Sequence, residues 1–144
     1  MDDHGTKAMV TREKTEEAFK NGWFHTGDIA HVDEEGFITI VERKKAVIIS
    51  GAENIYPREV ENVLHSHPKI REAAVFGIPD EKWGESVCAA VILKENESLT
   101  EEEIIAYCRE NIASYKKPRK VIFCESFPRN ALGKIQKGEL KSMV

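Results

Sequence analysis

The stretch IREAAVFGIPDEKWGESVCAAVIL, residues 70–93, consists of two apolar runs separated by a polar turn. Runs that are rich in β-branched and small apolar residues predict strands, here over residues 70–78 and 85–94. Between them, Pro79-Asp80-Glu81-Lys82 contains residues that favour turns. The sequence therefore predicts two strands joined by a turn, and the rest of the chain can be placed around them.

A helix is predicted before these strands, over residues 57–66. Its first residue is a proline, which suits the first turn of a helix. Val60, Val63 and Leu64 then recur with the spacing of one helical face. Pro68 ends the helix, because the residue before a proline disfavours helical geometry.

The segment after residue 94 predicts a second helix, a further strand and a short terminal helix. Thr100 and Glu103 form a capping box. A strand over 121–124 and a helix over 136–143 follow, and a short strand over 46–50 precedes the first helix. This mixed order predicts an α+β fold, with a small, mostly three-stranded sheet flanked by helices.

The first 44 residues predict a short helix over 11–20 and a β-hairpin with strands over 29–32 and 37–41. An isolated hairpin is marginally stable in water. We therefore expect this segment to pack against a second domain or against a partner.

Composition and charge limit the function. The chain has 144 residues, of which 41% are hydrophobic and 32% charged, a balance typical of soluble globular proteins. Residues 111–144 hold eight basic and two acidic side chains, whereas residues 1–110 hold 13 basic and 23 acidic ones. The basic end indicates either an anionic partner or a solvated surface. The pI of about 5.8 and the lack of nucleic-acid motifs argue against a nucleic-acid partner.

The lack of a visible targeting signal and the cysteine usage predict a cytoplasmic protein. No apolar run approaches the ~20 residues of a membrane span, and the opening residues MDDHGTKAMV lack the apolar region of a secretory signal. Cys88, Cys108 and Cys124 lie in apolar runs without a CxxC pair, so we expect three reduced thiols rather than a metal or catalytic site.

GWFHTGD, residues 22–28, has the glycine spacing of a phosphate-binding loop. That loop needs Lys and Ser/Thr after its second glycine, but Asp28 and Ile29 stand there, so we reject this function. The Asp28 carboxylate could instead accept hydrogen bonds from vicinal hydroxyls such as those of ribose. The alternative is a structural aspartate in a turn.

Several polar residues lie between the predicted elements. Arg43-Lys44-Lys45 could be a solvated loop, and Gly51 could be part of an ordinary turn. Lys134 could be an exposed lysine, or its ammonium group could reach an oxyanion from a glycine-containing loop. His65 and His67 suit helix capping better than metal binding, and no metal site is expected.

Taken together, GWFHTGD (22–28), GFITIVERKKAVIISGAENIYPREVE (36–61) and PRNALGKIQK (128–137) resemble the C-terminal part of the adenylate-forming superfamily. That superfamily includes acyl- and aryl-CoA synthetases, nonribosomal adenylation domains and luciferases. The resemblance extends from about Thr15 to Leu140. With IPDEKWGE (78–85) and SYKKPR (114–119), the chain looks most like the fatty-acyl or other acyl-CoA ligase branch.

The resemblance implies a two-step reaction, in which a carboxylic acid and ATP give an acyl-adenylate and CoA then displaces AMP. ATP with Mg²⁺ and CoA would be substrates, and no tightly bound cofactor is implied. By matched position, Asp28 would hold the ribose hydroxyls and Arg43 would assist at the nucleotide. Lys45 would be the hinge, and Lys134 the catalytic lysine of adenylation.

The resemblance also implies a CoA site, although Ala46 and Ala52 replace the acidic residue and the second glycine that are common in the family. The candidates for CoA binding are a small-residue loop, an indole and a basic run: Ser50, Gly51, Ala52, Trp83, Lys116, Lys117 and Arg119.

Residues 1–44 would then be the tail of a large N-terminal AMP-binding domain, and residues 45–144 the small mobile domain. The phosphate loop, the acyl pocket and most of the nucleotide site would belong to the large domain, so we expect the isolated chain to be inactive. One alternative is a non-catalytic module that binds CoA or a nucleotide, or docks on a separate large domain. Another is a nonribosomal adenylation module.

Overall fold

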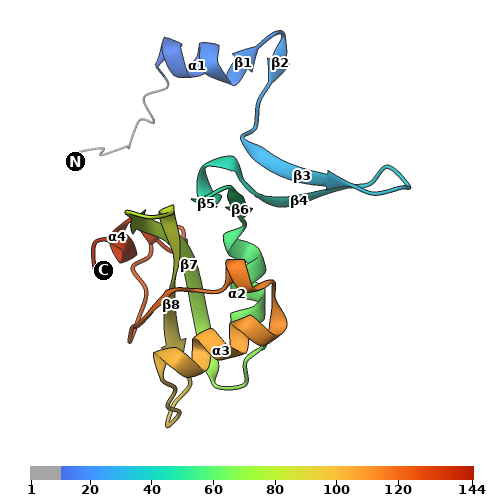
Figure 1. Cartoon of the computed structure of the whole chain (residues 1–144). Coiled ribbons are helices and arrows are strands. Elements are labelled where there is room, and N and C mark those ends of the chain that lie inside the picture. Colours follow the sequence, from blue (N-terminus) through green and yellow to red (C-terminus); the bar gives the residue numbers. More distant parts are fainter. Residues whose placement is uncertain (1–10) are drawn as a thin grey trace, which may run out of the picture.

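The computed structural model describes residues 11–144, so the expectation about a secretory signal at residues 1–10 lies outside the described residues. A sheet with helices on both sides forms the lower part of Figure 1, and the N-terminal segment extends above it. Along the chain the elements are α1 (Arg12–Ala18), β1 (Phe19–Lys20), β2 (Trp23–Phe24), β3 (Asp28–Val32), β4 (Ile38–Arg43), the 3₁₀ helix η1 (Lys44–Ala46), β5 (Ile48–Ser50), β6 (Glu53–Ile55), α2 (Pro57–Ser66), β7 (Ile70–Asp80), β8 (Gly84–Leu93), α3 (Glu101–Asn111), the 3₁₀ helix η2 (Ser114–Lys116), β9 (Lys120–Phe123) and α4 (Lys137–Lys141).

The β7–β8 hairpin forms the longest strand pair of the main sheet, and the sequence predicts both strands and their turn. Its strands pair antiparallel along their length, from Ile70 opposite Leu93 to Asp80 opposite Gly84. The Asp80 carboxylate accepts hydrogen bonds from the backbone N–H groups of Lys82 at 2.9 Å and Trp83 at 3.0 Å. Both bonds lower the pKa of Asp80, and the bond from the Trp83 N–H has the larger effect. The aspartate of the predicted turn therefore stabilises it directly.

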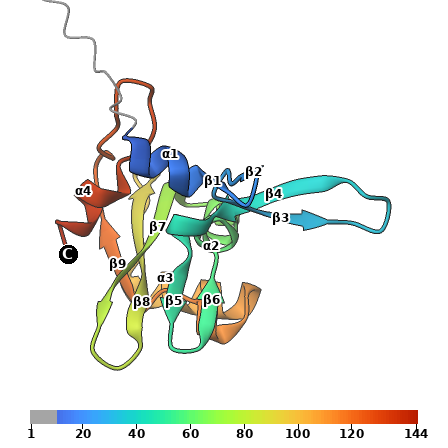
Figure 2. The same ribbon diagram turned by 90° about the horizontal axis from the view of Figure 1, so that it is seen from above.

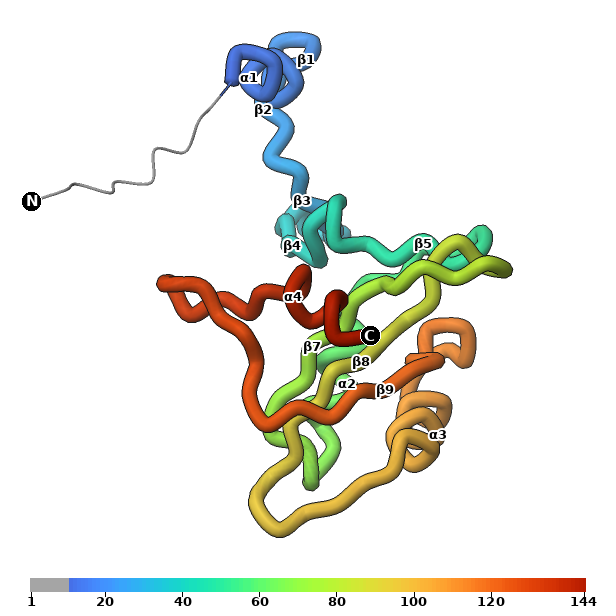
Figure 3. Tube along the Cα trace, turned by 90° about the vertical axis from the view of Figure 1, so that its left-hand side faces the viewer, coloured from blue at the N-terminus to red at the C-terminus, as the bar shows by residue number. Residues whose placement is uncertain are grey.

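Both faces of this hairpin are buried. Val75 belongs to a core cluster beneath α2 and α3, whereas its neighbour Phe76 belongs to a second cluster that includes Phe127 and Leu140 of the C-terminal segment. This alternation follows from the two-residue period of a strand. Figure 3 shows α3 and the loop before α4 on opposite sides of the sheet.

The α+β class is confirmed, but the sheet is larger than the mostly three-stranded one expected. It has five strands in the order β6-β5-β8-β7, and β9 pairs with β8 in parallel. The added strand is β6, which begins at Glu53, just after the turn considered for Gly51, and pairs with β5. The predicted strand at 46–50 begins only at Ile48, because residues 44–46 form η1.

Helix signals in the sequence place α2 and α3 correctly. The helix α2 covers Pro57–Ser66 as predicted. At the start of α3, the side chain of Thr100 accepts from the Glu103 N–H, and Glu103 accepts from the Thr100 N–H at 2.7 Å, which is the predicted capping box.

Side chains of α2 occupy the outer edge of β7. Glu61 accepts a hydrogen bond from the Val75 N–H at 2.8 Å, and His65 Nε2 accepts from the Ala73 N–H at 3.2 Å. Glu61 also forms an ion pair with Lys137 of α4 at 2.7 Å. Backbone donors that have no neighbouring strand are thus satisfied, and α4 is tied to α2.

The predicted N-terminal helix and hairpin are confirmed as α1, capped by Thr11, and the β3–β4 ribbon. A short β1–β2 pair, which the sequence analysis did not predict, lies between them. Their apolar side chains are mostly uncovered, including Phe19, Trp23, Phe24, Val32, Phe37, Ile38 and Ile40, each more than half exposed.

The three cysteines are free thiols. Burial raises the pKa of Cys88 and of Cys108 to about 11, and it also raises the pKa of Cys124. Thiols in this state are poor nucleophiles. Among residues 11–144, no helix is long and apolar enough to cross a membrane.

Gly77 provides a test of the close packing on β7. A Cβ at this position would lie 2.8 Å from Glu85 Oε1 and 3.2 Å from Ile48 Cγ2. Gly77→Ala should therefore lower the free energy of unfolding in urea by about 1–3 kcal/mol. Gly138→Ala is the matched control, because a Cβ there meets nothing within 4 Å. Equal effects of the two variants would contradict the packing described.

Candidate functional site

Asp28 and Arg43 lie opposite each other at the end of the β3–β4 ribbon away from its turn. They are register partners, and Arg43 Nε is 2.8 Å from Asp28 Oδ1. Arg43 Nη1 also donates to the Thr26 carbonyl oxygen at 3.2 Å. The second carboxylate oxygen of Asp28 has no hydrogen-bond partner among residues 11–144. That oxygen is available to accept from a ligand hydroxyl.

Lys134 lies in a tight loop, residues 129–135, whose shape depends on Asn130. The side-chain oxygen of Asn130 accepts from the backbone N–H of Leu132 at 3.0 Å and of Lys134 at 2.9 Å. Gly133 has φ +78°, which glycine adopts without strain. The Lys134 side chain is exposed and forms no ion pair within the described residues. A fixed backbone therefore carries a free ammonium group that can reach an anion.

The residues of the predicted small-residue loop lie against Trp83. Ser50 ends β5, and Gly51 and Ala52 form the turn to β6. The Gly51 N–H donates to the Trp83 carbonyl oxygen at 2.7 Å, and a Cβ on Gly51 would lie 3.0 Å from the indole. Figure 2 shows the tips of the β5–β6 and β7–β8 hairpins side by side.

Two cations lie over the Trp83 ring. Lys82 Nζ is 4.9 Å and Arg119 Cζ is 5.2 Å from its centroid, within cation–π range. Lys117 lies two residues before Arg119 and donates only to the Ser114 carbonyl oxygen, at 3.2 Å. We call Ser50, Gly51, Ala52, Trp83 and Arg119 the Trp83 cluster. Lys82 and Arg119 could each contact a phosphate-containing ligand, but the same hairpin tips also hold Asp80, Glu81 and Glu53.

Lys116 has a different environment from its neighbours. Its Nζ lies 2.7 and 2.8 Å from the two carboxylate oxygens of Glu59, and its side chain is only 18% exposed. The hydrogen bond to Glu59 raises the pKa of Lys116. The positive charge of Lys116 is therefore neutralised by Glu59.

Lys45 is exposed at the centre of η1, between β4 and β5. A cavity of about 300 Å³ adjoins it and is also lined by Glu85, Lys137 and Lys141. Lys45 thus lies on the short connection between the N-terminal ribbon and the main sheet, which is where a hinge would have to be.

The structure brings some predicted site residues together and leaves others apart. Asp28 pairs with Arg43, and the Trp83 cluster assembles from three separate segments. No hydrogen bond or ion pair within residues 11–144 joins either group to Lys134. Sequence reasoning missed Asn130 and Glu59. Asn130 could have been found, because Asn commonly bonds the backbone of turns, whereas nothing local indicates the distant partner of Lys116.

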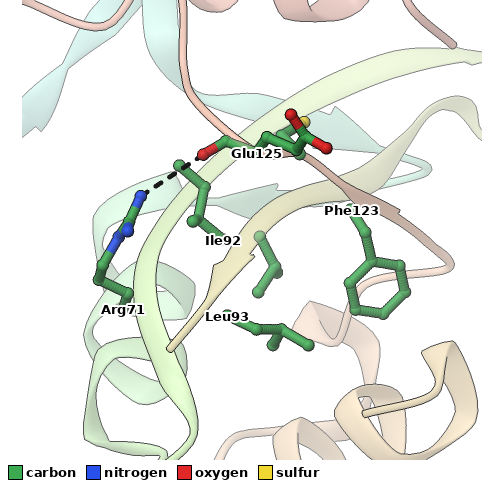
Figure 4. Close-up of a pocket in the computed structure, with 7 residues that line it drawn as sticks. Arg71, Ile92, Leu93, Phe123 and Glu125 are labelled. Carbon is green, nitrogen blue, oxygen red and sulfur yellow. Dashed lines mark hydrogen bonds between the residues drawn. The ribbon is translucent and has the colours of Figure 1, made fainter. Parts of the chain in front are cut away.

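A second cavity, of about 320 Å³, lies near the ends of β8 and β9. Figure 4 shows Arg71 at its rim, where the guanidinium donates to the Glu125 carbonyl oxygen at 3.4 Å. Aliphatic side chains, Phe123 and Cys124 form the rest of its lining. None of the predicted site residues lines this cavity. The described residues also contain no cluster of three or more potential metal ligands.

The fold and these groups of residues match a known class of domain. Residues 59–134, more than half of the chain, match the AMP-binding enzyme C-terminal domain. The chain belongs to this family.

Curated relatives of the chain are CoA ligases. It is 51% identical over 129 residues to the long-chain-fatty-acid–CoA ligase FadD13 of Mycobacterium tuberculosis, covering 90% of this chain and 25% of that protein. It is 50% identical over 132 residues to a 2-succinylbenzoate–CoA ligase of Bacillus mycoides, covering 92% of this chain and 27% of that protein. The chain therefore spans about a quarter of the length of these relatives.

A solved structure agrees with this assignment. The ATP-bound MatB of Rhodopseudomonas palustris is 36% identical, with a TM-score of 0.85 over 93% of this chain and 27% of MatB. The expected resemblance to the adenylate-forming acyl-CoA ligases is confirmed.

Replacement of Lys116 should lower the stability of the fold because it removes the ion pair with Glu59. Lys116→Met should lower the free energy of unfolding at pH 8 by roughly 1 kcal/mol. The folded-state pKa lies above the ordinary value of 10.5, so the contribution is complete below that pH and is lost as the pH rises through the folded-state value. Chemical unfolding at pH 8 and above pH 11 measures this difference. Lys117→Met is the control and should change stability by less than about 0.5 kcal/mol.

Proposed function

We propose that the chain is the C-terminal part of an AMP-forming acyl-CoA ligase. A carboxylic acid and ATP would form an acyl-adenylate and pyrophosphate, and CoA would then take the acyl group and release AMP. The observation that carries this proposal is Lys134, an exposed and unpaired cation on a rigid loop, in a chain that belongs to the family. Family membership and the fatty-acid–CoA ligase among its relatives support a fatty or similar carboxylic acid as substrate.

Lys134 is the catalytic residue of the first step in this proposal. The acyl carboxylate and the α-phosphate of ATP are both negative, so their approach is opposed by charge repulsion. An ammonium group between them lowers that repulsion and stabilises charge in the transition state. The Asn130 bonds hold the backbone of the lysine, so that little loop entropy is lost when the side chain engages.

Asp28 and Arg43 would bind the nucleotide. Arg43 occupies one oxygen of the Asp28 carboxylate and orients the other, which would accept from the ribose hydroxyls. The Arg43 guanidinium is exposed and would contribute positive charge near the phosphates. Mg²⁺ would enter with ATP as part of the substrate.

The Trp83 cluster would serve the second step. The small residues Ser50, Gly51 and Ala52 would let the turn approach a pantetheine arm, from the side of Gly51 that does not face the Trp83 ring. Lys117 and Arg119 would contact the phosphates of CoA. Trp83 supports the turn through its carbonyl oxygen and its ring. Because Lys82 and Arg119 lie over the ring, a CoA base would stack on the indole by displacing one of these cations. Lys116 would act indirectly, because Glu59 already pairs with it.

A large N-terminal domain would complete the enzyme. Residues 1–44 would be its tail and residues 45–144 the mobile domain, with Lys45 at the hinge. The exposed apolar side chains of residues 19–40 support this division, because a soluble protein seldom leaves so many of them uncovered. The relatives, about four times longer than the chain, also support it.

A chimera tests the role of Lys134. Residues 11–144 would replace the matching quarter of the Mycobacterium tuberculosis relative, and ATP–pyrophosphate exchange with fatty acids would be measured. Lys134→Ala should reduce the exchange rate about 10²–10³-fold while thioester formation from preformed acyl-adenylate remains. Lys141→Ala, another exposed lysine of the same segment, should leave both rates nearly unchanged.

Two results would contradict the proposal. One is equal loss of both half-reactions in Lys134→Ala, and the other is a folded chimera without exchange activity. If the chain alone also bound CoA or a nucleotide, that second result would favour a non-catalytic binding module. Exchange activity of the isolated chain would contradict the need for a large domain.

A further inference from the structure

One side chain provides the polar contact between the N-terminal segment and the rest of the chain. The Arg58 backbone N–H donates to Glu42 Oε2 at 3.1 Å. Within residues 11–144, this is the single hydrogen bond or ion pair between residues 11–43 and residues 45–144. Glu42 is the penultimate residue of β4, and Figures 1 and 2 show β4 beside the N-terminal end of α2.

This bond satisfies a backbone N–H group in the first turn of α2. The first N–H groups of a helix have no partner within it, and the N-cap residue Tyr56 provides no side-chain hydrogen bond. Arg58 is the second residue of α2, so Glu42 supplies the missing acceptor from 16 positions away. A carboxylate is the favoured group at this end of a helix because it faces the positive end of the helix dipole.

Glu42 is itself fixed in position. Its other carboxylate oxygen accepts from the Arg43 N–H at 2.9 Å, and the residue is half-buried. One oxygen therefore binds the end of the ribbon and the other binds α2. Lys45 comes only three residues later, so a rotation of the ribbon about Lys45 would separate Glu42 from Arg58.

We infer that Glu42 is a clasp that fixes the orientation of the β3–β4 ribbon on the domain formed by residues 45–144. Release of the clasp leaves the short connection at η1 and the packing of β4 beside α2 to set the orientation. Glu42 is thus a positioning residue, which determines how firmly Asp28 and Arg43 are held relative to Lys134 and the Trp83 cluster. The meaning of this motion for catalysis rests on the proposed function, whereas the clasp itself does not.

Nuclear magnetic relaxation on the 144-residue chain tests the clasp. In the wild type, the amides of His31 and Thr39 in the ribbon should tumble with the main sheet. In Glu42→Ala they should reorient faster than the sheet, and exchange of the Arg58 amide proton should accelerate about fivefold. Glu42→Gln should be intermediate, because its amide oxygen still accepts but carries no charge.

Glu34→Ala and Glu34→Gln are the matched controls. Glu34 lies in the turn of the same ribbon and its side chain makes no hydrogen bond within residues 11–144. These variants should match the wild type in both measurements. Unchanged amide shifts in the main sheet would show that each Glu42 variant remains folded.

The clasp is refuted if Glu42→Ala leaves ribbon tumbling and Arg58 exchange at wild-type values. The clasp is also refuted if the Glu34 variants loosen the ribbon as much as Glu42→Ala does. None of these measurements uses ATP, CoA or an acyl substrate, so a chain without any ligase role would still give a clear result. Conversely, a ribbon that stays rigid in Glu42→Ala would refute the clasp but would not contradict the proposed role of Lys134.

Discussion

Both faces of the β7–β8 hairpin are buried along its middle part, because α2 and α3 cover one side and the C-terminal segment covers the other. Both strands must therefore be apolar on both sides, and small residues such as Ala73, Ala74, Ala89 and Ala90 allow both layers to approach closely. Two of the proposed site groups are attached to this buried unit. Trp83 extends from its tip, and the loop of Lys134 continues from the segment that covers one face.

The charges of the domain divide into those with an internal partner and those without one. Glu59 neutralises Lys116 and Glu61 neutralises Lys137, and both pairs connect parts of the chain that are distant in sequence. Lys45, Lys134 and Lys141 form no ion pair within the described residues. Part of the basic excess of the last 34 residues thus stabilises the fold.

Local signals allowed most of the fold to be predicted. The capping box of Thr100, the apolar spacing in α2 and the turn at Asp80 each act within a few residues, so they can be read without knowledge of the whole structure. The strand β6 was missed although its pairing with β5 is also local. Ser50 lies opposite Glu53 across the two-residue turn Gly51-Ala52, and Gly51 has φ +64°. The polar residues Glu53 and Asn54 gave this short strand the composition of a loop.

The candidate site was predictable to a similar degree. The motifs that contain Asp28 and Arg43 led to residues that do lie together, and Lys134 is exposed as its proposed role requires. Lys116 shows the limit of the approach. It belongs to the same basic run as Lys117, and only the structure reveals its partner Glu59, 57 positions earlier. The chemical roles themselves rest on membership of the family rather than on geometry.

The strand edges differ between the two parts of the chain. Side chains of α2 occupy the outer edge of β7, whereas no strand of residues 11–144 pairs with either edge of the two-stranded β3–β4 ribbon, and one of its faces is apolar. Free apolar strands can recruit strands from other molecules and so promote aggregation. A chain shortened to begin near residue 45 would lose this liability and would be the better-behaved species at high concentration.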